Sequence, residues 1–133
     1  MLLEKESIDG KERVLLCVNA SLKKKAKDLI ILNVKELSSF ADYFIICSGT
    51  SDRQVQAIAS SIQENLKEFG IIPLGVEGER LGKWVLMDYN DVIIHIFYEP
   101  IRLFYDIERL WSDAPRMEIA DDVTELTALD KGI

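Results

Sequence analysis

One stretch of the sequence, residues 83–98, restricts the fold more than any other. Aliphatic, β-branched and aromatic residues fill both sides of Tyr89-Asn90, and asparagine tolerates the positive φ that tight turns require. The pattern predicts a β-hairpin with a two-residue turn at Tyr89-Asn90, in which Trp84 pairs with His95. A chain that contains this hairpin is expected to build a sheet around it and to cover that sheet with helices.

Side chains alternate across a strand, so the predicted hairpin has two faces of different character. One face is wholly apolar and needs a covering layer; it carries Val85, Met87, Val92, Ile94 and Ile96. The other, which we call the mixed face, carries Trp84, Leu86, Asp88, Asp91, Ile93, His95 and Phe97. A large, partly polar and aromatic face is typical of a surface that binds another protein.

The balance of charge limits the classes of partner. The chain has 23 acidic and 16 basic residues, and its formal net charge is −7 at pH 7. Binding to phosphates over a broad surface requires a basic footprint, so free nucleic acid is not an expected partner. A basic protein fits better, because opposite electrostatic fields speed the encounter of two proteins.

The sequence predicts neither a metal site nor a cofactor. Cys17 and Cys47 lie among apolar residues and form no C-x-x-C pair, and His95, the one histidine, cannot complete a zinc site. No apolar run reaches the roughly 18 residues of a transmembrane span, and residues 1–6 lack the apolar core of a signal peptide. We therefore expect a cytoplasmic protein with reduced core thiols and no membrane contact.

The rest of the chain predicts helices and strands in alternation. Apolar residues at helical spacing predict helices from Asp9 to Ala26, from Ser51 to Gly70 and from Pro100 to Trp111. Compact apolar runs predict strands at residues 29–34, 42–48 and 71–76. This order implies an α/β fold with a single mixed sheet of about five strands and packed helices. The chain of 133 residues is expected to form one domain over residues 1–117, followed by an acidic flexible tail over residues 118–133.

Several local features of these elements can be compared directly with a structure. Capping-box spacing relates Asp9 to Glu12 and Ser51 to Gln54, at the starts of two helices. Pro73 donates no backbone hydrogen bond, so the strand at residues 71–76 is expected at an edge of the sheet. The predicted buried stripe of the last helix is Leu103, Phe104, Ile107, Leu110 and Trp111.

Two arrangements of residues raise the question of catalysis. Residues 49–51, Gly-Thr-Ser, connect a strand to a helix N-terminus, where phosphate can bind, but the sequence has no G-x-G-x-x-G and no G-x-x-x-x-G-K-[ST] motif. Nucleotidyltransferases hold their metals with two carboxylates alternating on a strand, whereas Asp88 and Asp91 flank a turn. His95 could transfer protons, but no G-x-S-x-G elbow supplies a nucleophile. The residues favour a protein that is not an enzyme, and the alternative is a degenerate nucleotidyltransferase-like module that binds nucleotides.

Five blocks spread over residues 10–117 have a characteristic sequence and spacing. They are Asp28–Val34, Asp42–Gln54, Gly75–Gly78, Trp84–Phe97 and Phe104–Trp111. Together these blocks resemble the ribosomal silencing factor (Iojap) family. The resemblance implies a fold similar to that of nucleotidyltransferases without the catalytic carboxylates.

The same resemblance implies a translation regulator that is not an enzyme and uses no cofactor. Members of this family bind a large-subunit ribosomal protein on the face that meets the small subunit, which blocks subunit joining when nutrients are short. The contact surface of the family includes the tryptophan that matches Trp84, and a homodimer is left open. The expected partner-binding residues are Glu77, Lys83, Trp84, Leu86, Asp88 and His95.

Overall fold

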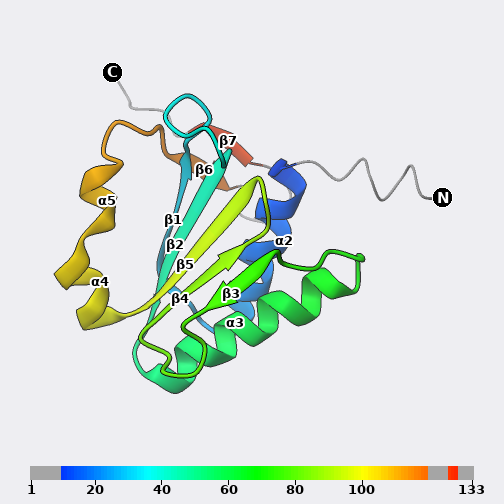
Figure 1. Ribbon diagram of the computed structural model, residues 1–133, viewed down its shortest axis with the longest axis vertical. Coiled ribbons are helices and arrows are strands. Elements are labelled where there is room, and N and C mark those ends of the chain that lie inside the picture. Colours follow the sequence, from blue (N-terminus) through cyan, green and yellow to red (C-terminus); the bar gives the residue numbers. More distant parts are fainter. Residues whose placement is uncertain (1–9, 120–125, 129–133) are drawn as a thin grey trace.

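The computed structural model describes residues 10–119 and 126–128, which form an α/β fold with one mixed five-stranded sheet. The strands follow the order β1-β2-β5-β4-β3, and helices lie on both faces of the sheet (Figure 1). The strands of this sheet are β1 Lys27–Asn33, β2 Tyr43–Gly49, β3 Gly75–Glu77, β4 Trp84–Asp88 and β5 Val92–Tyr98. The helices are α2 Gly10–Lys23, α3 Asp52–Lys67, α4 Glu99–Tyr105 and α5 Ile107–Leu110. The predicted fold class is confirmed.

Strands β2 and β5 run parallel at the centre of the sheet, and the other neighbouring strands are antiparallel. Every residue of β2 is buried, as its continuous apolar sequence predicts for a strand covered on both faces. Helices α2 and α3 pack on one face, whereas α4 and α5 pack on the other. The described residues therefore form two apolar clusters, one on each side of the central strands.

The hairpin forms as predicted, but its register differs by two residues. Trp84 lies opposite Phe97, not opposite His95, and the loop residues are Asn90 and Asp91. The Asp88 carboxylate accepts a hydrogen bond of 2.8 Å from the backbone N–H of Asn90, whose φ is +78°, and this local bond places the turn one residue later. Because side chains alternate with a period of two, this shift leaves both faces of the strands unchanged.

The wholly apolar face of the hairpin is the floor of the larger core. Its residues are Val85, Met87, Val92, Ile94 and Ile96, and all are buried in the cluster with α2 and α3. The free thiols of Cys17 and Cys47 lie in the same core, where burial raises the pKa of both. Their interpretation as core thiols is confirmed.

Half of the predicted capping box forms at the start of α3. Ser51 Oγ accepts a hydrogen bond of 3.1 Å from the backbone N–H of Gln54. The Gln54 side chain does not return to Ser51; its Oε1 accepts from the Thr50 N–H at 2.7 Å, and its Nε2 donates to the carbonyls of Lys24 and Lys25. The start of α3 is thereby fixed to the turn between α2 and β1. Asp9, the cap predicted for the first helix, lies outside the described residues.

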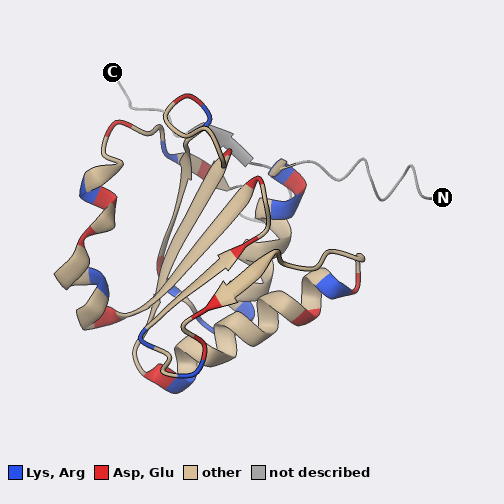
Figure 2. Ribbon diagram, viewed as in Figure 1, with Lys and Arg blue, Asp and Glu red and all other residues tan. Residues whose placement is uncertain are grey.

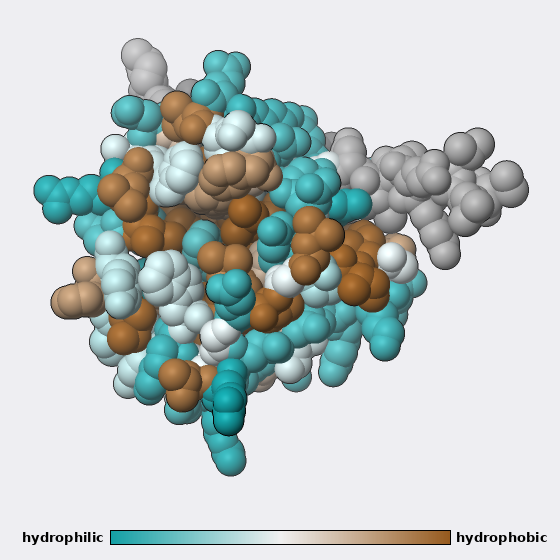
Figure 3. Space-filling view, viewed as in Figure 1, coloured by the Kyte–Doolittle hydropathy of each residue, from teal (hydrophilic) through white to brown (hydrophobic). Residues whose placement is uncertain are grey.

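The prediction of one continuous last helix is wrong. Asp106 has a left-handed backbone conformation with φ +46° and divides the segment into α4 and α5. Three residues of the expected buried stripe are instead among the most exposed apolar side chains: Leu103 is 81 %, Phe104 78 % and Leu110 80 % exposed. Figure 3 shows apolar atoms at the surface where α4 and α5 lie. Ile107 is buried as expected, because the break turns α5 back toward the sheet.

Strand β3 and the chain beyond residue 117 also differ from expectation. β3 lies at the sheet edge as predicted, but it spans Gly75–Glu77, and its pairing begins beyond Pro73. Residues 118–133 were expected to form a flexible tail, yet β6 Met117–Ile119 pairs with β7 Leu126–Ala128. The other tail residues lie outside the described part of the chain. None of the described helices has the length and apolarity that a membrane crossing requires.

Candidate protein-binding site

The two halves of the mixed face have different surroundings. Over β2 and β5 this face is covered by α4, α5 and the segment after them, and Phe97 is buried in one cluster with Ile107 and Ala114. Over β4 the same face stays partly open, and Trp84 and Leu86 are half-buried. The mixed face predicted from the sequence is therefore core on one side and accessible surface on the other.

A hollow of about 300 Å³ lies on the open half, at the edge of the sheet. We call it the edge hollow; it is lined by Glu77, Gly78, Trp84 and Leu86. Glu77 lies opposite Leu86 across β3 and β4, and Leu86 lies opposite His95 across β4 and β5. Three of the predicted partner-binding residues, Glu77, Trp84 and Leu86, thus line one hollow. A fourth, His95, lies on the next strand, opposite Leu86.

The indole of Trp84 is held on three sides. Its Nε1–H donates a hydrogen bond of 3.2 Å to Nδ1 of His95. Its ring packs on Phe97 with 4.8 Å between ring centroids and on Tyr105 of α4 with 5.0 Å. The side chain is therefore half-buried and fixed in orientation, with part of its surface left to the edge hollow.

His95 lies mostly inside the protein, with 7 % of its surface exposed. Its ring meets the edge of Phe44 at a centroid distance of 5.4 Å and stacks over Phe97 at 6.2 Å. Burial lowers the pKa of His95 from 6.5 to about 4, because the charged imidazolium loses its solvation. The imidazole is therefore neutral near pH 7, and Nδ1 keeps the lone pair that accepts the indole proton.

Gly78 lines the edge hollow at a position where no side chain fits. Its φ is +87°, and a Cβ atom added there would collide with the carbonyl oxygen of Trp84. The loop after β3 therefore packs directly on the backbone of the first residue of β4. Sequence reasoning did not select Gly78 or Tyr105 as site residues; the available signal was Gly78 itself, because glycine is the residue that most readily adopts a positive φ.

A family model described as "Ribosomal silencing factor during starvation" matches residues 7–131 of this chain. The chain belongs to the ribosomal silencing factor family. The resemblance inferred from the five sequence blocks is therefore confirmed.

Individual ribosomal silencing factors are similar over most of their length. The ribosomal silencing factor of Halalkalibacterium halodurans is 42 % identical over 112 residues, which cover 84 % of this chain and 96 % of that protein. That of Bacillus subtilis is 44 % identical over 96 residues, covering 72 % of this chain and 81 % of its own. A crystal structure of a Chromobacterium violaceum protein matches with a TM-score of 0.75 at 42 % identity, covering 76 % of this chain and 84 % of that one. The names of the two relatives describe a regulatory activity.

Two of the predicted partner-binding residues lie away from the edge hollow. Lys83 precedes Trp84 and pairs with Tyr98, so it lies on the opposite face of the hairpin, with its Nζ 4.7 Å from the centre of the Tyr98 ring. Asp88 lies at the far end of β4, where its carboxylate holds the hairpin turn. Asp91 was expected on the mixed face, but it is a loop residue bonded to Arg13 of α2 at 2.9 Å.

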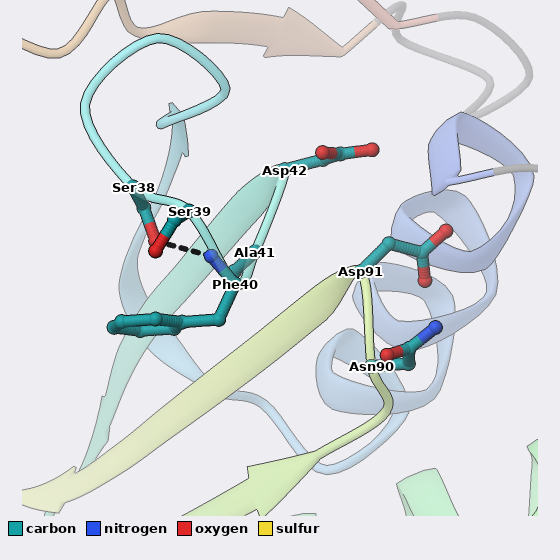
Figure 4. A pocket seen from close by; sticks show the side chains of 7 residues that line it. All are labelled: Ser38, Ser39, Phe40, Ala41, Asp42, Asn90 and Asp91. Atoms are coloured by element: carbon teal, nitrogen blue, oxygen red, sulfur yellow. Dashed lines mark hydrogen bonds between the residues drawn. The ribbon is translucent and has the colours of Figure 1, made fainter.

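A second hollow, of about 330 Å³, lies beside the hairpin turn and is lined mainly by polar residues (Figure 4). Its lining residues are Ser38, Ser39, Phe40, Ala41, Asp42, Asn90 and Asp91. Two of its oxygens are already used within the protein, since Ser38 Oγ accepts from the Phe40 N–H and Asp91 binds Arg13. Within residues 10–119 and 126–128, no three His, Cys, Asp or Glu side chains lie close enough to hold a metal.

The turn between β2 and α3 starts helix α3. The backbone N–H of Thr50 donates to the Gln54 side chain, and the backbone N–H of Gln54 donates to the Ser51 side chain. The space in front of Gly49 is filled by Val55, whose Cγ2 would lie 3.1 Å from an added Cβ atom. These contacts support the interpretation of residues 49–51 as a structural turn.

Proposed function

We propose that this protein binds the large ribosomal subunit, through a ribosomal protein on the face that meets the small subunit, and thereby prevents subunit joining. The family to which the chain belongs supports this proposal, and the observation that carries it is Trp84, half-buried and fixed in orientation at the edge hollow. A large aromatic side chain beside a concave, partly apolar surface is the usual anchor of a protein–protein interface.

The acidic residues that end β3 and β4, together with the net charge of the chain, favour a basic partner. Figure 2 shows acidic residues at the ends of β3 and β4, and these are Glu77 and Asp88. The whole chain carries a formal net charge of −7. Ribosomal proteins bind RNA and are accordingly basic on much of their surface, so the long-range electrostatic interaction accelerates their encounter with this protein.

The proposed mechanism is steric occupancy. The edge hollow is built on strands of a five-stranded sheet, so the bound protein presents a rigid body where the small subunit would otherwise dock. No bond is made or broken in this mechanism. Translation falls because occupied large subunits do not pair with small subunits.

Sedimentation of purified subunits through sucrose gradients tests the proposal. We expect the protein to migrate with large subunits, to be absent from small subunits, and to reduce the peak of joined ribosomes as its concentration rises. Phe40→Ala serves as a control variant, because it removes an exposed aromatic side chain at the second hollow and leaves the edge hollow unchanged. This variant should bind and act as wild type does. Equal binding to both subunits, or undiminished subunit joining at saturating protein, contradicts the proposal.

A further inference from the structure

We infer that His95 is a positioning residue for partner binding: it fixes the orientation of the Trp84 indole by accepting its N–H, an inference that rests on the proposed function. His95 is too deeply buried to offer much contact surface of its own. Its effect on the partner is therefore expected to pass through Trp84.

The backbone pairing does not by itself bring these two side chains together. The residue opposite Trp84 is Phe97, and the residue opposite His95 is Leu86. Trp84 and His95 are therefore diagonal neighbours on one face of the hairpin, at a distance that only long or aromatic side chains can span. The hydrogen bond of 3.2 Å exists because the indole leans along the sheet toward His95 while it packs on Phe97.

His95 is suited to act as a fixed point. It lies on the central strand β5, and its ring is confined by Phe44 from the edge and by Phe97 from one face. Trp84, by contrast, is the first residue of β4 and lies next to the loop at residues 78–83. The hydrogen bond thus holds Trp84, at the border of the sheet, to a residue that is fixed at the centre of the sheet.

A fixed anchor binds more tightly than a mobile one, because a side chain that is already ordered loses less conformational entropy on association. Removing the acceptor would leave only the packing on Phe97 and Tyr105 to hold the indole, which would give its side-chain torsions more freedom. We expect this freedom to weaken binding about five- to tenfold. The direct contact area of the site would hardly change.

Two substitutions separate the acceptor from the ring. His95→Phe keeps an aromatic ring in the space but removes the acceptor, whereas His95→Asn offers an amide oxygen near the position of Nδ1. We expect His95→Phe to bind large subunits about five- to tenfold more weakly than wild type and His95→Asn to bind within about twofold of wild type. Thermal denaturation of both variants identifies any loss that comes from unfolding.

A mutant cycle with Trp84→Phe distinguishes positioning from a general structural role. Phenylalanine has no indole N–H, so His95→Phe is expected to cost no further affinity in a Trp84→Phe protein. The indole N–H resonance of Trp84, assigned with a Trp111→Phe variant, gives a second measurement that needs no ribosome. We expect its hydrogen exchange to accelerate in His95→Phe and to stay slow in His95→Asn.

Each outcome decides a separate question. Unchanged binding of His95→Phe, or an equal loss in the presence and absence of the indole N–H, overturns the positioning role while the proposed function stands. A wild-type protein that fails to bind large subunits overturns the proposed function and the positioning role together. If His95→Phe does not fold, rapid exchange of the wild-type Trp84 indole N–H, or a loss of affinity in a folded His95→Asn protein as large as that expected for His95→Phe, overturns the positioning role.

Discussion

Arg102 of α4 donates a hydrogen bond of 2.7 Å to Ser48 Oγ on β2, with only 8 % of the arginine exposed. The same guanidinium donates two further bonds of 3.1 Å to the carboxylate of Glu108 on α5. One buried side chain therefore attaches both short helices to the central sheet. This attachment explains why the segment breaks at Asp106 instead of continuing as one helix, since α5 must turn back to bring Glu108 to Arg102.

The first prediction concerns this attachment. Arg102→Ala is expected to lower the free energy of unfolding by about 2–3 kcal/mol, because it leaves Ser48 and Glu108 without their shared donor. Arg102→Lys should restore only part of this loss, since an ammonium cannot bond the carboxylate through two parallel donors. Urea denaturation measures both, and Arg109→Ala, an exposed arginine on α5, should change the value by less than about 0.5 kcal/mol.

The second prediction compares the two tryptophans. Trp84→Ala is expected to weaken binding to large subunits at least about tenfold, equivalent to 1.4 kcal/mol, and to cost about 1–2 kcal/mol of stability because the side chain is half-buried. Trp111 packs edge-on against Phe44 at 4.8 Å in the covered half of the face. Trp111→Ala should therefore destabilise the fold at least as much, while its folded molecules bind normally. Calorimetry and co-sedimentation give the two quantities, and the reverse pattern would place the binding surface elsewhere.

The third prediction uses two glycines of the same edge. Gly78→Ala is expected to destabilise the protein by at least about 1–2 kcal/mol and to weaken binding, because the added methyl group would collide with the Trp84 carbonyl at a residue with positive φ. Gly75→Ala is the matched control, because an added Cβ atom there meets no atom within 4 Å. Its stability should stay within about 0.5 kcal/mol of wild type. Equal behaviour of the two variants in urea denaturation would contradict this account of the edge hollow.

The fourth prediction concerns pH. The pKa of His95 is lowered from 6.5 to about 4 by burial, so the unfolded chain binds more protons than the folded protein between these values. The stability associated with neutral His95 is therefore complete above about pH 7, declines as the pH falls through 6.5, and is fully lost below 4.

Relative to pH 7, the loss attributable to His95 should reach about 2 kcal/mol at pH 5. Urea denaturation at several pH values measures it, and a His95→Phe variant supplies the background contribution of the carboxylates. If wild type and His95→Phe lose stability in parallel between pH 7 and pH 5, His95 does not have the lowered pKa.

The faces of the hairpin could be predicted because alternation is a local property of any strand. Val85 and Met87 are buried under α2 and α3, and Trp84 and Leu86 lie on the other face, even though the predicted turn was placed one residue early. The position of the turn depended on one hydrogen bond, which the Asn90 N–H donates to the Asp88 carboxylate and which the alternation does not encode. Helix α3 could likewise be predicted, because its apolar stripe and its Ser51 cap are adjacent in sequence.

The sequence by itself therefore determined the fold class, the family and the two faces of the hairpin, and it selected Trp84 as a predicted partner-binding residue. Only the tertiary structure decided which half of the mixed face stays accessible, because that depends on where α4 and α5 pack. Their packing is set by contacts between distant residues, such as the bond from Arg102 to Ser48, which lies 54 residues earlier in the chain. With Arg102 turned inward, Leu103 and Phe104 are exposed, although the periodicity of the segment predicted that they are buried. Helical periodicity records which side chains share a face, whereas the choice of the buried face follows from the free energy of long-range contacts.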